Sequence, residues 1–320
     1  MKGGFYMKKI YSSLSLFLVF VISLYGCSAV HQYKRINLKA EMLGGESEIS
    51  EMIQSTTDVE NYSINSYSDK MPVYKITPRE ISSDEFQEFA DSLGFTAEMT
   101  MNNKNLPRFQ QGQSGVSEKT LSMPNNNSIS YLIGYGDEEP LGFTDEELKS
   151  KAQTIFNSLL LIEGEYEYLG ISSTQTLLLE NEEFVVQKRV SFRRLIDGIR
   201  VIGNDICDLY FNSTGLSGIQ LTFYDYEKTG ELDMLTLDDA VAKVKEPDAF
   251  ILESETNQNF SGAADKLTIE RTKLLFVNQY SDGCEILQPV YNLMGTAENA
   301  GGSVEFSARI IAIPEKYTHD

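Results

Sequence analysis

The sequence predicts an α+β fold made of serial units, each with one helix packed on an antiparallel sheet, in two or three copies. Three observations lead to this prediction. Three short helix patterns begin at a Ser or Thr cap, each is followed by a group of strand patterns, and helices do not separate the strands one by one. A doubly wound parallel sheet requires that regular alternation, so the strands are expected to pair antiparallel.

The N-terminus has the pattern of a secretory signal. Lys8 and Lys9 precede an apolar run over residues 14–24, and Gly26 stands directly before Cys27. A charged segment, a short apolar segment and a small residue before the cleavage point are typical of a signal peptide, and the run is too short for an ordinary membrane-spanning helix. An uncleaved N-terminal anchor is the alternative interpretation.

The Gly26-Cys27 pair resembles the lipobox of bacterial lipoproteins, which ends in a small residue and the cysteine that receives the lipid. The resemblance implies transfer of a diacylglyceryl group to the Cys27 thiol and cleavage before Cys27, with acylation of the freed amine as a further step. Two or more acyl chains give stable anchoring. We therefore expect residues 1–27 to be a lipoprotein signal peptide, with Cys27 holding the protein on the extracytoplasmic face of a Gram-positive cell membrane.

The rest of the chain is expected to form four parts. Residues 28–70 are rich in Ser, Glu, Asn and Gly without a sustained apolar period, which predicts a flexible tether. Three α+β units follow in the prediction: an N-terminal unit over 71–140, a central unit over 141–230 and a C-terminal unit over 231–320.

Each predicted helix start carries a capping signal. The three starts are Ser82-Ser-Asp-Glu85, Thr144-Asp-Glu-Glu147 and Thr236-Leu-Asp-Asp239. In each of them an acid stands three residues after a Ser or Thr, which is the spacing of a capping box or a close relative of one. The acids also place negative charge at the helix N-terminus, where the helix dipole favours it.

Strands are expected between and after these helices, where apolar and β-branched residues alternate or cluster between turn signals. Outside the central hairpin described below, the expected strands cover residues 73–76, 119–123, 128–135, 166–171, 174–180, 216–226, 267–280, 287–295 and 304–313.

The central hairpin runs over residues 183–212, with its turn at Asp197-Gly198. Asp-Gly between apolar runs is the strongest short-range hairpin signal, because both central residues of a type I′ turn need positive φ.

A two-residue turn also sets the register of this hairpin. It places Ile196 opposite Ile199 and Phe192 opposite Gly203. One face of the hairpin is then mostly apolar, and we expect the helix that starts at Thr144 to pack on it.

Three segments of this region carry a resemblance to known domains: Arg189-Val-Ser-Phe192, Ile196-Asp-Gly-Ile-Arg-Val-Ile-Gly-Asn-Asp-Ile206 and Tyr210-Phe-Asn-Ser-Thr-Gly215. Together with Leu237-Asp-Asp-Ala240 and Leu287-Gln-Pro-Val-Tyr291, they resemble PepSY and FTP-type domains over roughly residues 141–313. The resemblance implies a helix packed on a small antiparallel sheet in the central and C-terminal units. Such domains occur in propeptides of secreted metalloproteases and in membrane-anchored regulators of Gram-positive sensor kinases.

The composition argues against several function classes. The formal net charge is −20, and such a surface repels nucleic acid, so no nucleic-acid partner is expected. The chain has two histidines, His31 and His319, which excludes a His-Glu-x-x-His zinc helix and a triad built on a core histidine. We therefore expect a protein that is not an enzyme and uses no cofactor and no metal.

Cysteines and acidic clusters leave alternatives open. Cys207 and Cys284 are expected to be thiols, with a disulfide between them as the alternative in an exported protein. Acidic clusters at 137–139, 145–147 and 238–239 are candidates for acid–base chemistry or weak calcium binding, but their places at turns and helix starts favour capping. A hydrolase that uses only carboxylates stays open, and it would need two buried acids with perturbed pKa values in a cleft.

Basic residues are concentrated in the central hairpin of this acidic chain. The cluster comprises Lys188, Arg189, Arg193, Arg194 and Arg200. One interpretation is that they pair with the chain's own acidic helix starts. The other is an electropositive ridge for an acidic partner, with Arg189, Arg193 and Arg200 as the candidate partner-binding residues.

These observations favour a membrane-anchored extracytoplasmic lipoprotein that acts as a non-enzymatic protein-interaction or regulatory module in the bacterial cell envelope. Its expected partners are the membrane, through the lipid on Cys27, and another envelope protein. The alternative function is a ligand-binding receptor for a transporter or an envelope polymer. That alternative predicts a large apolar pocket with converging polar groups.

Overall fold

The computed structural model of this chain describes residues 32–35, 58–60, 69–112, 118–134, 139–179, 182–245, 250–253, 264–280 and 283–319. The predicted signal peptide, Cys27 and most of the predicted tether lie outside these ranges. Within them, no helix is long and apolar enough to span a membrane.

The three predicted helices begin at the predicted caps. They are α3 (Ser83–Ser92), α4 (Asp145–Phe156) and α5 (Leu237–Ala242). Complete capping boxes stand at the starts of α3 and α4, and the Thr236 hydroxyl accepts a hydrogen bond from the Asp239 backbone N–H at the start of α5. Two short 3₁₀ helices, η2 (Lys243–Lys245) and η4 (Glu315–Tyr317), complete the described helical segments.

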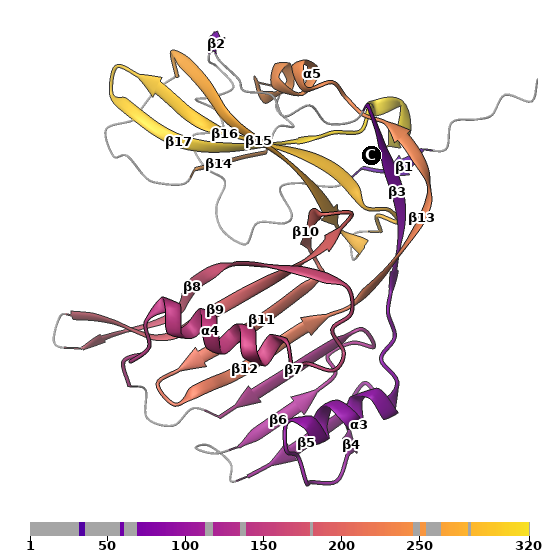
Figure 1. Ribbon diagram of the computed structural model, residues 1–320, viewed down its shortest axis with the longest axis vertical. Helices are drawn as coiled ribbons and strands as arrows, with labels where there is room; N and C mark the ends of the chain where they lie inside the picture. Colours follow the sequence, from indigo (N-terminus) through magenta and orange to yellow (C-terminus); the bar gives the residue numbers. More distant parts are fainter. Residues whose placement is uncertain are drawn as a thin grey trace, which may run out of the picture.

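Most of the remaining described chain is β-strand (Figure 1). The strands are β1 (Tyr33–Lys34), β2 (Asp58–Glu60), β3 (Lys70–Pro78), β4 (Thr100–Met101), β5 (Pro107–Gln111), β6 (Lys119–Ser122), β7 (Ser128–Ile133), β8 (Glu165–Leu179), β9 (Glu182–Ile196), β10 (Ile199–Gly203), β11 (Ile206–Asn212), β12 (Gly215–Thr222), β13 (Tyr224–Asp233), β14 (Phe250–Glu253), β15 (Lys266–Asn278), β16 (Gln288–Asn299), β17 (Gly302–Ile311) and β18 (Thr318–His319).

The predicted serial helix-on-sheet units, with their PepSY-like architecture, are wrong. Fourteen of the described strands form one mixed sheet, in the order β14-β17-β16-β15-β10-β9-β11-β12-β7-β6-β5-β4, with β2 added on β15 and β8 on β9. The two halves join where β10 pairs in parallel with β15, from Val201 opposite Phe276 to Gly203 opposite Asn278. This pairing makes the central hairpin a bridge between halves, because its second strand continues into the C-terminal sheet.

A separate ribbon connects the two halves along one side of the molecule. β3 and β13 pair antiparallel over nearly their whole length (Figure 1). At its upper end the ribbon contributes to the core of the β15–β17 half, where the Tyr74 ring meets Phe276 edge-on at 5.8 Å between centroids. The ribbon thus supports the junction from the side.

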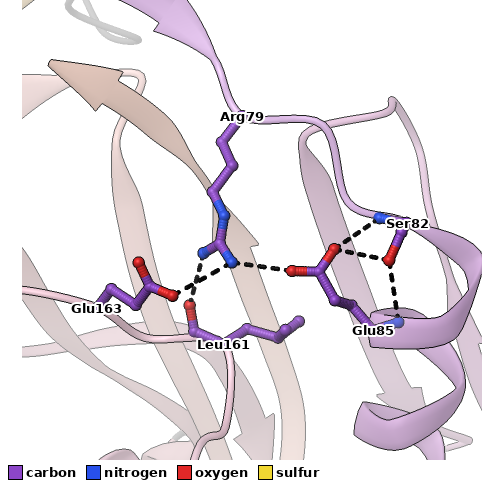
Figure 2. A network of polar contacts seen from close by, with 5 residues as sticks. All are labelled: Arg79, Ser82, Glu85, Leu161 and Glu163. Carbon is purple, nitrogen blue, oxygen red and sulfur yellow. Dashed lines mark hydrogen bonds and ion pairs between the residues drawn. The ribbon is translucent and has the colours of Figure 1, made fainter. Parts of the chain in front are cut away.

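Arg79, directly after β3, ties α3 to the loop that follows α4 (Figure 2). Its guanidinium donates to Glu85 Oε1 at 2.9 Å and to the Leu161 carbonyl at 3.1 Å, and Glu163 Oε1 lies 3.5 Å from Nη2. Glu85 also completes the capping box with Ser82, whose backbone N–H and hydroxyl donate to it and lower the pKa of Glu85. One carboxylate therefore both starts the helix and anchors it.

The helix that starts at Thr144 packs on the apolar face of the hairpin, as predicted. The rings of Phe156 and Phe192 are stacked at 4.4 Å between centroids, and Leu148 and Ala152 of α4 are fully buried in the same cluster. Aromatic pairs of this kind add to the free energy gained from burial alone.

The predicted hairpin register is correct at the turn and wrong beyond it. Asp197 and Gly198 both have positive φ, and Ile196 faces Ile199. Phe192, however, lies opposite Cys207 and not opposite Gly203, a shift of four residues. The reason is that β10 leaves β9 to join β15, so the chain bends before β11 returns to β9.

Gly295 gives a first test of this packing. A Cβ atom at this buried position of β16 would lie 1.8 Å from the Thr268 carbonyl oxygen of β15, so the two strands would have to move apart. We expect Gly295→Ala to destabilise the fold by on the order of 1–3 kcal/mol, as overpacking does. Urea unfolding measures this, with Gly142→Ala as the control, because Gly142 has no atom within 4 Å of its added Cβ. Equal effects of the two variants would contradict the close strand contact.

Candidate functional site

Four of the five basic residues of the central hairpin pair with acids of the same chain, and Arg194 lies over the Tyr166 ring, 5.4 Å from its centroid. Arg193 Nη1 donates to Asp208 Oδ1 at 2.8 Å, and Arg189 Nη1 lies 3.7 Å from Asp208 Oδ2. Asp208 is 3% exposed, so its carboxylate is held between two guanidinium groups in a largely dry setting. Buried carboxylates are found in such paired arrangements because an isolated charge would be costly to bury.

Arg200 and Lys188 also have acidic partners. Arg200 Nε donates to Glu167 Oε1 on β8, and Lys188 Nζ lies 2.6 Å from Asp145 Oδ1 at the start of α4. The structure thus brings Arg189 and Arg193 together at Asp208 and places Arg200 on a different acid. A role for these three arginines in binding a partner stays a prediction.

A polar cavity of about 440 Å³ lies beside the hairpin turn, where the β3–β13 ribbon crosses it. The Tyr74 hydroxyl donates to Asp197 Oδ2 within the lining, and burial is the main cause that raises the pKa of Tyr74 to about 12. The lining residues are Tyr74, Glu165, Arg194, Leu195, Ile196, Asp197, Tyr224, Asp225 and Tyr226. This set is mostly polar or charged, unlike the apolar pocket that the receptor alternative predicts.

Asp205 is a buried acid connected to this cavity through Tyr226. Asp205 is 1% exposed, the Tyr226 hydroxyl donates to its Oδ2 at 2.7 Å, and Asn278 donates to the Tyr226 oxygen at 3.0 Å. Its Oδ1 is buried without a hydrogen-bond partner among the described residues. Burial raises the pKa of Asp205 to about 6. Asp205 does not itself line the cavity, so it does not supply a pair of acids in a cleft for a hydrolase.

The other candidate chemical groups lie apart from each other. Cys207 and Cys284 are both buried, in two different apolar clusters, and no disulfide joins them. Across the described ranges, no group of three or more His, Cys, Asp or Glu side chains is placed to hold a metal ion.

Sequence reasoning missed the exposed edge of β8. The sequence predicts two short strands there, at 166–171 and 174–180, whereas the structure has one continuous strand of 15 residues. β8 pairs along its length with β9, and no other described strand pairs with it. None of the residues from Glu165 to Leu178 is buried. The available signal was the uncharged stretch from Tyr168 to Leu179, which contains no proline either.

The far part of β8 forms a two-stranded ribbon with β9 that extends past the sheet (Figure 1). β11 ends its pairing with β9 at Lys188, and the ribbon continues beyond it. Near its tip, Leu178 is 72% exposed. At the base of the ribbon, Thr174 Oγ1 donates to Gln187 Oε1 at 2.9 Å. We call the outer side of residues 165–178 the β8 edge.

Comparisons with known proteins give a weak structural likeness. No protein-family model matches the sequence, and no curated protein matches it. Among solved structures, the chain is similar to the crystal structure of YycH from Bacillus subtilis, with 11% sequence identity and a TM-score of 0.40. The aligned region covers 74% of this chain and 51% of the YycH chain, so it spans about half of that protein. A likeness this weak carries no argument about the function of the chain.

Proposed function

We propose that the chain is an extracytoplasmic lipoprotein of a Gram-positive cell envelope, anchored through Cys27, that works as a non-enzymatic interaction or regulatory module. The Gly26-Cys27 lipobox pattern supports the anchor. The β8 edge carries the interaction part of the proposal, because it offers a strand of another envelope protein a long row of backbone groups to pair with.

Exposed strand edges are normally protected in monomeric proteins. Charged side chains, prolines, bulges or very short length prevent the addition of another strand. β8 has some irregular pairing with β9, but from Tyr168 to Leu179 it has neither charge nor proline, in a protein whose net charge is −20. A strand of a partner that pairs with this edge would gain main-chain hydrogen bonds, and alternate side chains would give specificity.

The tip of the β8–β9 ribbon adds an apolar contact to this edge. A two-stranded ribbon has little stability of its own in water, and Leu178 gains little from burial as long as it stays 72% exposed. A partner strand that lies along β8 would cover this side chain. The binding free energy would then come from both backbone pairing and apolar burial.

Photo-crosslinking in intact cells tests the proposal. A photoreactive residue at the exposed Thr176 of β8 should give an adduct with a membrane protein of the envelope. We expect Leu178→Lys to reduce this adduct at least about tenfold, which corresponds to about 1.4 kcal/mol, because a charge would have to be buried against the partner. Leu132→Lys is the matched control, since Leu132 is also an exposed strand leucine, at 54%, on β7.

Two outcomes would contradict this role of β8. One is an adduct at Thr176 whose yield is the same in the Leu178→Lys and Leu132→Lys variants. The other is no adduct at Thr176 while a probe at the exposed Lys104, in the loop between β4 and β5, gives one.

A further inference from the structure

We infer that the end of the folded body formed by β1 and β18 faces the lipid surface and lies within roughly 20 Å of it. This inference rests on the proposed anchor at Cys27. If the β1–β18 end meets the membrane, the orientation of the folded body, and with it the position of the β8 edge, is set.

β1 belongs to the folded body. Tyr33 and Lys34 pair in parallel with Thr318 and His319 of β18. The Lys34 carbonyl accepts a hydrogen bond from the side-chain amide of Gln288, which is completely buried. Gln288 therefore depends on β1 for one of its hydrogen bonds, and a buried amide left without its partner is costly.

Side-chain contacts of the same segment support its attachment. The Tyr33 ring packs against an apolar cluster that includes Val277 and Ile313. On either side of β1, Gln32 Nε2 donates to the Lys316 carbonyl at 3.4 Å, and the Cys284 thiol lies 3.8 Å from the Arg35 carbonyl. The segment 32–35 is thus held by β18, by the turn before it and by the core.

The chain between the lipid and β1 is short. Residues 28–32, five in number, separate Cys27 from Tyr33. A fully extended chain advances at most about 3.6 Å per residue, so Tyr33 lies at most roughly 20 Å from the lipidated cysteine. In this proposal the spacer between membrane and body is five residues long, and not the whole of the predicted tether 28–70. An uncleaved anchor would give nearly the same spacing, because the apolar run ends at residue 24.

The place of β1 in the body sets how the body is oriented on the membrane. β1 and the C-terminal segment lie together in the upper half of the molecule, on the side of β3 and β13, while α3 and β4–β6 lie at the lower end, and the β8–β9 ribbon leaves the body on the side away from β1 (Figure 1). A short link at the β1 end therefore keeps α3 and β4–β6 away from the membrane. It also leaves the β8 edge open to a neighbouring protein.

Fluorescence quenching on vesicles tests the orientation with two matched lysine sites. Lys316→Cys in η4 marks the β1–β18 end, and Lys104→Cys marks the opposite end; both positions are exposed. Cys207 and Cys284 are each 1% exposed, so a thiol-reactive fluorophore should label the introduced cysteine selectively. The full lipidated chain is reconstituted in phosphatidylglycerol–phosphatidylcholine vesicles that carry a headgroup nitroxide quencher.

We expect strong quenching at position 316 and its absence at position 104. Inserting about twenty Gly and Ser residues after Ser28 should abolish the quenching at 316 without releasing the protein from the vesicles, because a flexible spacer lets the body leave the surface. Equal quenching at both positions, or quenching at 316 that survives the spacer, would overturn the inference while leaving the anchor intact.

The anchor itself is checked separately by Cys27→Ser. We expect this variant to lose both incorporation of labelled fatty acid and vesicle binding. If the variant keeps its membrane attachment and the parent chain carries no lipid, the proposed lipid anchor fails. The quenching result then decides on its own whether the β1–β18 end faces the bilayer.

Discussion

Replacing Asp208 by asparagine is expected to destabilise the fold by about 3–5 kcal/mol, the range found when one partner of a buried ion pair is removed. Asp208 is buried between Arg193, at 2.8 Å, and Arg189, at 3.7 Å. Asparagine keeps the shape of the side chain but removes its charge, so the largely buried Arg193 guanidinium would lose its counter-charge. Urea unfolding at neutral pH measures the change.

Two further variants show whether the lost charge is the cause. Asp145→Asn breaks the pair with Lys188, but the Asp145 side chain is 63% exposed, so the expected cost is below about 1 kcal/mol. The double variant Asp208→Asn/Arg193→Met should be more stable than Asp208→Asn alone, because it removes the unpaired cation as well. An Asp208→Asn variant as stable as Asp145→Asn would contradict this account.

The same pairs bear on the predicted electropositive ridge. If Arg189, Arg193 and Arg200 serve mainly to hold the sheet together, then replacing all three by Ser should lower stability and leave the Thr176 adduct unchanged. If they meet an acidic partner, then the adduct should fall as well. Because these arginines form ion pairs with Asp208 and Glu167, stability should fall in both cases. The yield of the Thr176 adduct distinguishes them.

Local signals made part of the fold predictable. The caps at Ser82, Thr144 and Thr236 and the turn at Asp197-Gly198 depend on residues within a few positions of each other, and they stand where the sequence predicts them. The apolar face of the hairpin was also predictable despite the wrong register. A shift of four residues is even, so every side chain stays on its predicted side of the sheet.

Pairing between distant strands was not predictable in the same way. Val201 of β10 lies opposite Phe276, which is 75 positions later in the chain. The sequence of a strand indicates which of its faces is apolar, but it does not indicate which strand will occupy its edge. The serial units were inferred from the order of helices and strands, and that order is equally compatible with one continuous sheet.

The same limit hid the candidate site. The arginines were visible in the sequence, but in the predicted register Asp208 would lie opposite Gln187. In the structure Asp208 lies opposite Ser191, between Arg189 and Arg193. The β8 edge was hidden for a related reason, since an edge exists only relative to the strands that fail to cover it.

Lowering the pH from 7 to 5 is expected to stabilise the protein through Asp205. Burial raises the pKa of this carboxyl from its ordinary 3.8 to about 6, so between these values the folded state binds more protons than the unfolded state. Stability then falls as the pH rises through this range. At one pKa unit per 1.36 kcal/mol, the burial of the charged form costs about 3 kcal/mol at pH 7.

Asp205→Asn should therefore raise stability at pH 7 and flatten its dependence between pH 7 and pH 5. The amide keeps an acceptor for the Tyr226 hydroxyl and carries no charge to desolvate. Urea midpoints of the parent and of the variant at both pH values give the measurement, and any pH dependence that the two proteins share cancels in the comparison. Asp225→Asn, at an exposed position beside the same cavity, should keep the parent's pH dependence.

Between pH 5 and pH 7 the change in stability reports on Asp205, because Glu85 and Glu147 have lowered pKa values and affect stability only at lower pH. Hydrogen bonds from Ser82 and Thr144 lower the pKa values of Glu85 and Glu147, so the stability that these caps contribute is lost only as the pH falls below their ordinary 4.5. A pH dependence that persists unchanged in Asp205→Asn would mean that another group causes it. If it disappears, then the junction between the two halves of the sheet contains a charge that weakens the fold at neutral pH, next to the cavity lined by Tyr226.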